Sequence, residues 1–215
     1  TGEDTLSLHD ALPIFALKGF SNPEGVAVLE NGMIALTDER KRNLSIFELD
    51  SQTRELDLAD AKPFDLGFPD AGNKGFEGIA WDPAQQRLLL GKERAPTAMF
   101  SLGSDGQRLL DQELRPLPSY GLGMRNLSAL SVDPRTGHIL ALSAQSRLLL
   151  ELDEKGEPVS FISLLGGQSG LESRIPRAEG VAMGDDAKAA ALDSAEQSIR
   201  AQVVAANQRT MAQAA

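Results

Sequence analysis

Three glutamates occupy the same place in a phrase that recurs along this 215-residue sequence. The phrase reads Pro23-Glu24-Gly25-Val26-Ala27, Phe76-Glu77-Gly78-Ile79-Ala80 and Ala178-Glu179-Gly180-Val181-Ala182, with an altered copy at Asn126-Leu127-Ser128-Ala129-Leu130. Three carboxylates that converge with an amide or a hydroxyl form an oxygen-rich cage, which suits Ca²⁺ better than zinc. The candidate metal ligands are therefore Glu24, Glu77 and Glu179, with Asn126 from the altered copy.

The spacing of the phrase indicates how these side chains could meet. Glu24, Glu77, Ser128 and Glu179 follow one another at intervals of 53, 51 and 51 residues. A period of about 52 residues, with short strands joined by turns, predicts the blades of a β-propeller. Each blade's first strand lines the central channel, so we expect the acids to form a ring at its mouth, where they repel unless a cation binds. The alternative is that they lie in strand-edge turns and face water.

The glycine after each glutamate suggests that backbones approach one another closely near the propeller axis. A second recurrence, Asp38-Glu39-Arg40 and Lys92-Glu93-Arg94, follows the second expected strand of two repeats. We interpret these acids and arginines as local ion pairs. The alternative is that their side chains reach the same face of the channel as the repeated glutamates. His138 lacks a recognisable triad motif, so no catalytic residue is assigned.

Four short strands are expected in each repeat, joined by turns such as Asn31-Gly32 and Asp133-Pro134. The fold class is therefore all-β, an incomplete propeller of about three blades plus part of a fourth. The expected strands cover residues 25–29, 33–37, 43–49 and 54–58, then 77–81, 87–91, 97–102 and 107–114, then 127–132, 138–143, 147–152 and 158–164, and finally 179–183.

The two ends of the sequence differ in composition and residue pattern from the repeats, which span residues 16–186. Residues 1–15 include a run that resembles a translated sequencing adapter, so we interpret them as foreign, with an ordinary N-terminal turn as the alternative. Residues 187–215 are Ala-rich and predict a helix, either a true C-terminal cap or the product of a frame change. Because known propellers have at least four blades, we expect an open arc with exposed strand edges and poor solubility.

Composition excludes several classes of function. The net charge of −10 argues against nucleic acid as a partner, because phosphate binding needs a basic face. The absence of cysteine excludes disulfides and thiolate metal sites. No apolar run is long enough to span a membrane, and no signal peptide is visible. Nothing in the composition indicates a particular small-molecule or protein partner.

Several ordered motifs together resemble the SdiA-regulated family over residues 16–186. They are Asn22-Pro23-Glu24-Gly25, Thr37-Asp38-Glu39-Arg40, Lys74-Gly75-Phe76-Glu77-Gly78, Gly91-Lys92-Glu93-Arg94, Asn126-Leu127-Ser128, Asp133-Pro134 and Pro176-Arg177-Ala178-Glu179-Gly180. The resemblance implies a five-bladed propeller of the bacterial envelope, in the periplasm and often membrane-anchored, with a calcium site. Carried over to this sequence, the ligand candidates are again Glu24, Glu77 and Glu179, with Asn126.

The sequence departs from the family pattern at three places. We expect the anchor and opening blade to be absent, Ala144 and Gln145 stand where members often carry acids, and the Ala-rich stretch replaces the strand after Asp186. The leading functional interpretation is a non-enzymatic, calcium-binding envelope module with a binding or scaffold role. The alternative is a metal-dependent hydrolase of the esterase, lactonase or phytase-like propeller type, in which Arg40 and Arg94 would hold an anionic substrate.

Overall fold

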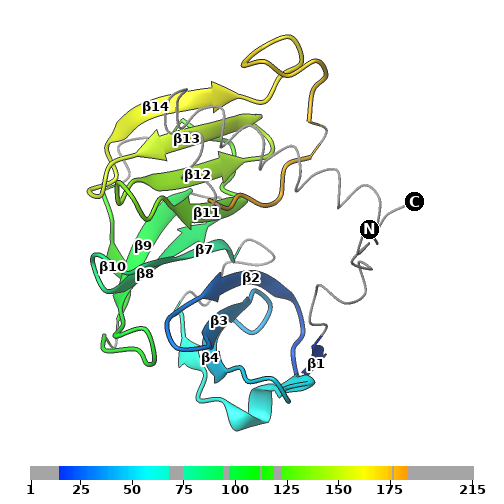
Figure 1. Ribbon diagram of the computed structural model, residues 1–215, viewed down its shortest axis with the longest axis vertical. Coiled ribbons are helices and arrows are strands. Elements are labelled where there is room, and N and C mark those ends of the chain that lie inside the picture. The colour runs from blue at the N-terminus through cyan, green and yellow to red at the C-terminus, as the bar shows by residue number, and fades with distance from the viewer. Residues whose placement is uncertain are drawn as a thin grey trace, which may run out of the picture.

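The structure is a computed structural model that describes residues 15–67, 75–93, 97–111, 113–118, 123–175 and 177–183. Its strands form three four-stranded antiparallel sheets and one two-stranded sheet. Figure 1 shows the three larger sheets following one another from the blue first sheet to the yellow third, as propeller blades do. The expected C-terminal helix over residues 187–215 and all of the N-terminal segment before Phe15 lie outside the described residues.

The first blade consists of β2 (Pro23–Val28), β3 (Met33–Asp38), β4 (Asn43–Glu48) and β6 (Phe64–Asp65). The predicted hairpin turn between β2 and β3 is confirmed. Asn31 and Gly32 both adopt positive φ angles, 54° and 77°, which the turn requires at its two central positions. A two-residue turn of this kind sets the register of the hairpin, because side chains alternate between the two faces.

The predicted fourth strand of the first blade, residues 54–58, is wrong. That segment forms β5 (Glu55–Asp57), which pairs in parallel with β1 (Ala16–Lys18) in the separate two-stranded sheet. It continues into a short 3₁₀ helix, η1 (Leu58–Asp60). Leu56 and Leu58 are buried in a cluster with Ile34, Leu36 and Phe47 on one face of the first blade. Burial of these two leucines favours this position of the segment over pairing at the blade edge.

The second and third blades follow the expected order. The second contains β7 (Phe76–Asp82), β8 (Arg87–Lys92), β9 (Ala98–Gly103) and β10 (Arg115–Pro116), so its last strand starts after the predicted 107–114 segment. The third contains β11 (Ala129–Val132), β12 (Ile139–Ser143), β13 (Leu148–Leu152) and β14 (Pro158–Ser163), close to the predicted ranges.

The fourth repeat begins differently from the prediction. Residues 177–183 were expected to include a strand, but they run as irregular chain in the structure. Ala178 is nonetheless buried against the apolar face of the third blade, with Ala129, Leu140 and Leu142 in the same cluster. The segment therefore packs beside the third blade without a ladder partner among the described residues.

Aliphatic side chains fill the space between blades, in keeping with an aromatic content of 5%. One cluster joins the first and second blades and includes Ala27, Leu44, Ile79 and Leu90; another joins the second and third and includes Leu127. The inner strands β2, β7 and β11 lie in succession, and β7 contacts both of the others. Because the inner strands are neighbours, residues that open them are brought to one place.

Candidate functional site

Glu24 and Glu77 lie at equivalent bulges in the inner strands. In β2 the register of pairing with β3 skips between Pro23 and Gly25, and in β7 it skips between Phe76 and Gly78. The glutamate is the extra residue in both cases. A bulge leaves one residue out of the ladder and changes the direction of its side chain, which is why bulges often occur beside functional sites.

All four residues predicted as metal ligands line a single pocket of about 500 Å³. The pocket lies where the inner strands begin, and acids dominate one side of it. Its full lining is Glu24, Glu77, Glu93, Asn126, Ser128, Ala144, Gln145, Arg177 and Glu179. The structure thus brings the repeated phrase of all four repeats to one place.

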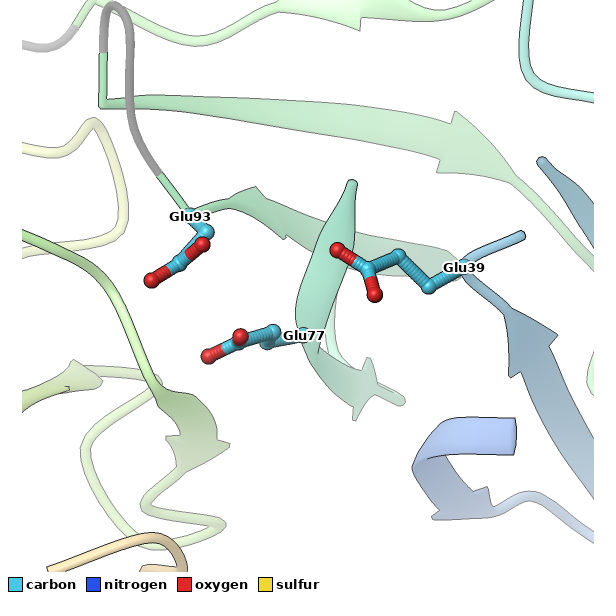
Figure 2. A group of neighbouring side chains, drawn as sticks. All are labelled: Glu39, Glu77 and Glu93. Carbon is cyan, nitrogen blue, oxygen red and sulfur yellow. The ribbon is translucent and has the colours of Figure 1, made fainter. Parts of the chain in front are cut away.

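A tighter group of carboxylates shares Glu77 and Glu93 with this pocket. Glu39, Glu77 and Glu93 each offer one carboxylate oxygen, and these three oxygens lie within 4.8 Å of one another. Figure 2 shows that the three side chains reach the same space from different strand ends. Such separations suit a Ca²⁺ ion, whose oxygen ligands lie roughly 2.3–2.6 Å from the metal.

Glu39 and Glu93 were predicted as members of local ion pairs and were not among the predicted metal ligands. Glu39 follows β3 and Glu93 follows β8, and both side chains are buried, with exposed fractions of 6% and 3%. The signal that could have identified them is the hairpin itself. Because β3 runs antiparallel to β2, and β8 to β7, a residue just after the second strand lies beside the start of the first.

Hydrogen bonds hold two of the acids in position. The Asn22 amide nitrogen donates to Glu24 Oε1 and to Glu39 Oε2, both at 2.8 Å. The backbone N–H of Gly75 donates to Glu39 Oε1 at 2.8 Å. A carboxylate can accept about four hydrogen bonds or ligand contacts, so each of these groups keeps capacity for a cation.

The acids perturb one another electrostatically. Burial raises the pKa of Glu77 to about 7, with further contributions from the charges of Glu93, Glu24, Glu39 and Glu179. Burial also raises the pKa of Glu24, where repulsion from Glu39 adds to the effect and the hydrogen bond from Asn22 opposes it. Burial and the neighbouring carboxylates thus both disfavour the charged forms of Glu77 and Glu24.

The third-blade side of the pocket is neutral and internally bonded. The Asn126 carbonyl oxygen accepts from Ser143 Oγ at 2.9 Å and from the Gln145 N–H at 3.0 Å, while its Nδ2 donates to Ser128 Oγ at 2.8 Å. Asn126 thus links Ser128, Ser143 and Gln145 by hydrogen bonds on this side of the pocket. Of the predicted ligands it is the one whose oxygen already has two protein partners.

The basic residues near the repeated motifs have different positions. Arg177 lines the pocket and forms an ion pair with Glu179. Arg40 is exposed and is not among the lining residues, and Arg94 lies outside the described part of the chain. His138 lies away from the pocket lining and its Nδ1 pairs with Glu151 Oε1 at 2.7 Å.

Comparison with known families decides the membership of the chain. A family model described as SdiA-regulated matches residues 9–189. The chain belongs to the SdiA-regulated family. The predicted resemblance is confirmed, and the motifs around Glu24, Glu77 and Glu179 lie inside the matched region of this SdiA-regulated chain.

Similarity to one solved structure, with a TM-score above 0.5, supports the β-propeller fold of this SdiA-regulated protein. A chain of a nidogen/laminin complex has a TM-score of 0.52 at 17% identity, covering 78% of this chain and 54% of that one. A Thermus thermophilus protein described as a putative oxidoreductase (glucose dehydrogenase) has a TM-score of 0.49 at 16% identity, covering 79% and 56%. The chain thus spans about half the length of these structures.

Proposed function

We propose that this SdiA-regulated chain is part of a calcium-binding β-propeller that serves as a binding or scaffold module of the bacterial cell envelope. The observation that carries the proposal is the convergence of Glu39, Glu77 and Glu93 at a shared space. These three residues would hold the cation, with Glu24 and Glu179 along the adjoining pocket wall. The cation would neutralise charges that otherwise repel and would tie the first two blades together.

Calorimetric titration of metal-free protein with Ca²⁺ and, separately, with Mg²⁺ tests this proposal. We expect Ca²⁺ to bind and Mg²⁺ to bind more weakly, because Mg²⁺ requires a near-ideal octahedron of closer ligands. Glu77→Gln should weaken Ca²⁺ binding by about tenfold or more. Glu157→Gln, which changes an exposed acid outside the site, is the matched control. Absence of Ca²⁺ binding by the wild type, or equal binding by Glu77→Gln, would refute the site.

A metal-dependent hydrolase is the second candidate function, and one observation favours it. Arg177 lines the pocket together with Glu77 and Glu93. Its guanidinium would hold an anionic substrate beside a cation bound by these acids, and the cation would polarise the bond to be cleaved. Assays with p-nitrophenyl acetate, a γ-lactone and bis(p-nitrophenyl) phosphate, with and without Ca²⁺, separate the two functions. Calcium-dependent turnover that is lost in Glu77→Gln would favour the hydrolase.

The envelope location is proposed from the family resemblance. No helix among the described residues combines the length and apolar character needed to cross a bilayer. Fractionation of cells that express the natural full-length protein tests the location, with periplasmic and membrane fractions probed separately. Recovery of the protein only in the cytoplasmic fraction would contradict the proposal.

A further inference from the structure

A groove of about 600 Å³ lies between the first and second blades, and it shares no lining residue with the acidic pocket. The first blade contributes residues of β3 and β4 together with residues 62–64, which lead into β6. The second blade contributes residues 107–111, from the connection between β9 and β10. The volume falls within the roughly 300–1,000 Å³ that is typical of small-molecule sites. The groove is therefore large enough for a small ligand that touches both blades.

The floor of the groove is part of the apolar core between these two blades. Leu44 and Ile46 are two residues apart in β4, so their side chains point to the same face, and that face packs against the second blade. Leu44 is fully buried, whereas Met33, Ile46, Phe64 and Leu109 are only partly buried at the edge of the same cluster. An apolar surface that is left partly uncovered in this way suits an alkyl chain.

The charged part of the lining carries an excess of positive charge. Lys62 comes from the first blade and Arg108 from the second. Among the described residues of the lining, Asp111 is the one acid, and its carboxylate accepts from the Gly103 N–H at 2.7 Å and from the Arg115 guanidinium at 2.6 Å. The groove thus has two cations and one acid that is already neutralised by an arginine. In a chain of net charge −10, this local excess favours an anionic ligand.

Arg108 has hydrogen-bond donors to offer such a ligand. Its Nε–H donates to Asp105 at 3.1 Å, in a turn where the same carboxylate also accepts two backbone N–H groups. Asp105 is not part of the lining, and the arginine side chain is 79% exposed. Because a guanidinium has five N–H donors, this pair engages only one of them. Glu48, which lies opposite Met33 across the β3–β4 ladder, is also outside the lining.

We propose that this groove binds a single molecule of a fatty acid. Lys62 and Arg108 would hold the carboxylate, and the alkyl chain would lie on the apolar floor formed by both blades. An anion without a chain would leave the floor uncovered, and an alkane without a head group would leave the two cations unused. The ligand sits in a concave groove, which favours a monomeric fatty acid over a membrane surface. This site is independent of the proposed calcium site.

Calorimetric titration of the whole chain with sodium decanoate, below its critical micelle concentration, tests this proposal. EGTA in the buffer prevents calcium from precipitating the acid and removes the calcium site from the measurement. Decanol has the same chain with a neutral head group, and decyltrimethylammonium has the same chain with a cationic one. We expect decanoate to bind at least about tenfold more tightly than either, and acetate, which lacks the chain, to show no binding.

Two variants locate the site. Lys62→Gln/Arg108→Gln should weaken decanoate about tenfold and leave decanol unchanged, because it removes only the charges. Leu110→Asn replaces an apolar lining residue that is 56% exposed, so it should weaken both ligands while the fold persists. Arg125→Gln/Lys155→Gln, which changes two exposed cations outside the groove, is the matched control and should bind decanoate like the wild type.

Several results would overturn the proposal. They are no binding of decanoate, equal binding of decyltrimethylammonium, and an equal loss of decanoate affinity in the control double variant. Sedimentation with phosphatidylglycerol vesicles separates the remaining source of an alkyl anion. Binding to these vesicles without binding of decanoate would indicate a membrane surface and would also overturn the proposal.

Discussion

Gly25 of the first blade lies directly against the backbone of Glu77 in the second. A Cβ atom at Gly25 would lie 2.9 Å from the Glu77 carbonyl oxygen and 2.8 Å from both Ile79 Cγ2 and Thr37 Oγ1. The glycine of one copy of the repeated phrase therefore packs on the glutamate of the next. The same two-residue phrase serves blade packing through its glycine and the acidic pocket through its glutamate.

This contact predicts that Gly25→Ala destabilises the protein. A methyl group there must push against backbone, which yields less than a side chain, so the free energy of unfolding should fall by about 1–3 kcal/mol. Gly180→Ala is a matched control from the same phrase, since nothing lies within 4 Å of its added Cβ. It should be neutral or slightly stabilising. Urea denaturation of the two variants checks this, and equal losses would contradict the close-approach account.

Metal-free protein should lose stability as pH rises. The pKa of Glu77 is raised from 4.5 to about 7, so the folded state binds this proton more tightly than the unfolded state does. The stabilisation is then fully present below about pH 4.5 and is lost as pH rises toward 7. Thermal melts of chelator-treated protein at pH 5 and pH 8 measure the decline. Saturating Ca²⁺ should reduce it, and Glu77→Gln should remove most of it. A flat profile in metal-free wild type would contradict this.

Asn22 should matter for calcium binding although it need not touch the metal. Its amide donates to both Glu24 and Glu39, so Asn22→Ala frees two carboxylates that repel each other. We expect Ca²⁺ affinity to fall about tenfold in calorimetry. Gln85→Ala, an exposed amide in the β7–β8 turn, is the control and should bind like wild type. Unchanged affinity in Asn22→Ala would show that the carboxylates hold their positions without it.

Two similar acid–arginine pairs should differ in how much they contribute to the free energy of unfolding. Asp82 is fully buried and pairs with Arg87 at 2.9 Å, and Arg87 also donates to the Glu154 carbonyl of the third blade. Asp133 pairs with Arg135 at 2.8 Å, but that arginine side chain is 45% exposed. Arg87→Ala should therefore cost about 3 kcal/mol and Arg135→Ala about 1 kcal/mol or less. Chemical denaturation of both variants checks the order, and a larger loss in Arg135→Ala would contradict it.

The strands of the third blade were predictable because the apolar runs and the turn residues between them indicate the same strand boundaries. Apolar residues fill β12 and β13, and the Asp133–Gly137 turn ends with Gly137 at a φ of 74°. The fourth strand of the first blade was not predictable. Residues 54–58 and 64–65 are both short segments with apolar members, and only the burial of Leu56 and Leu58 on the outer face decides which one joins the blade.

The sequence by itself determined the repeat, the all-β propeller class, the family and the four residues that come to line one pocket. Periodicity and turn chemistry suffice for these because they are local and recur at a fixed interval. Only the tertiary structure decided that Glu39 and Glu93 join Glu77 and that residues 55–57 leave the first blade to pair with β1. Both depend on which segments pair across the fold, and pairing is settled by competition for buried surface between segments far apart in the chain.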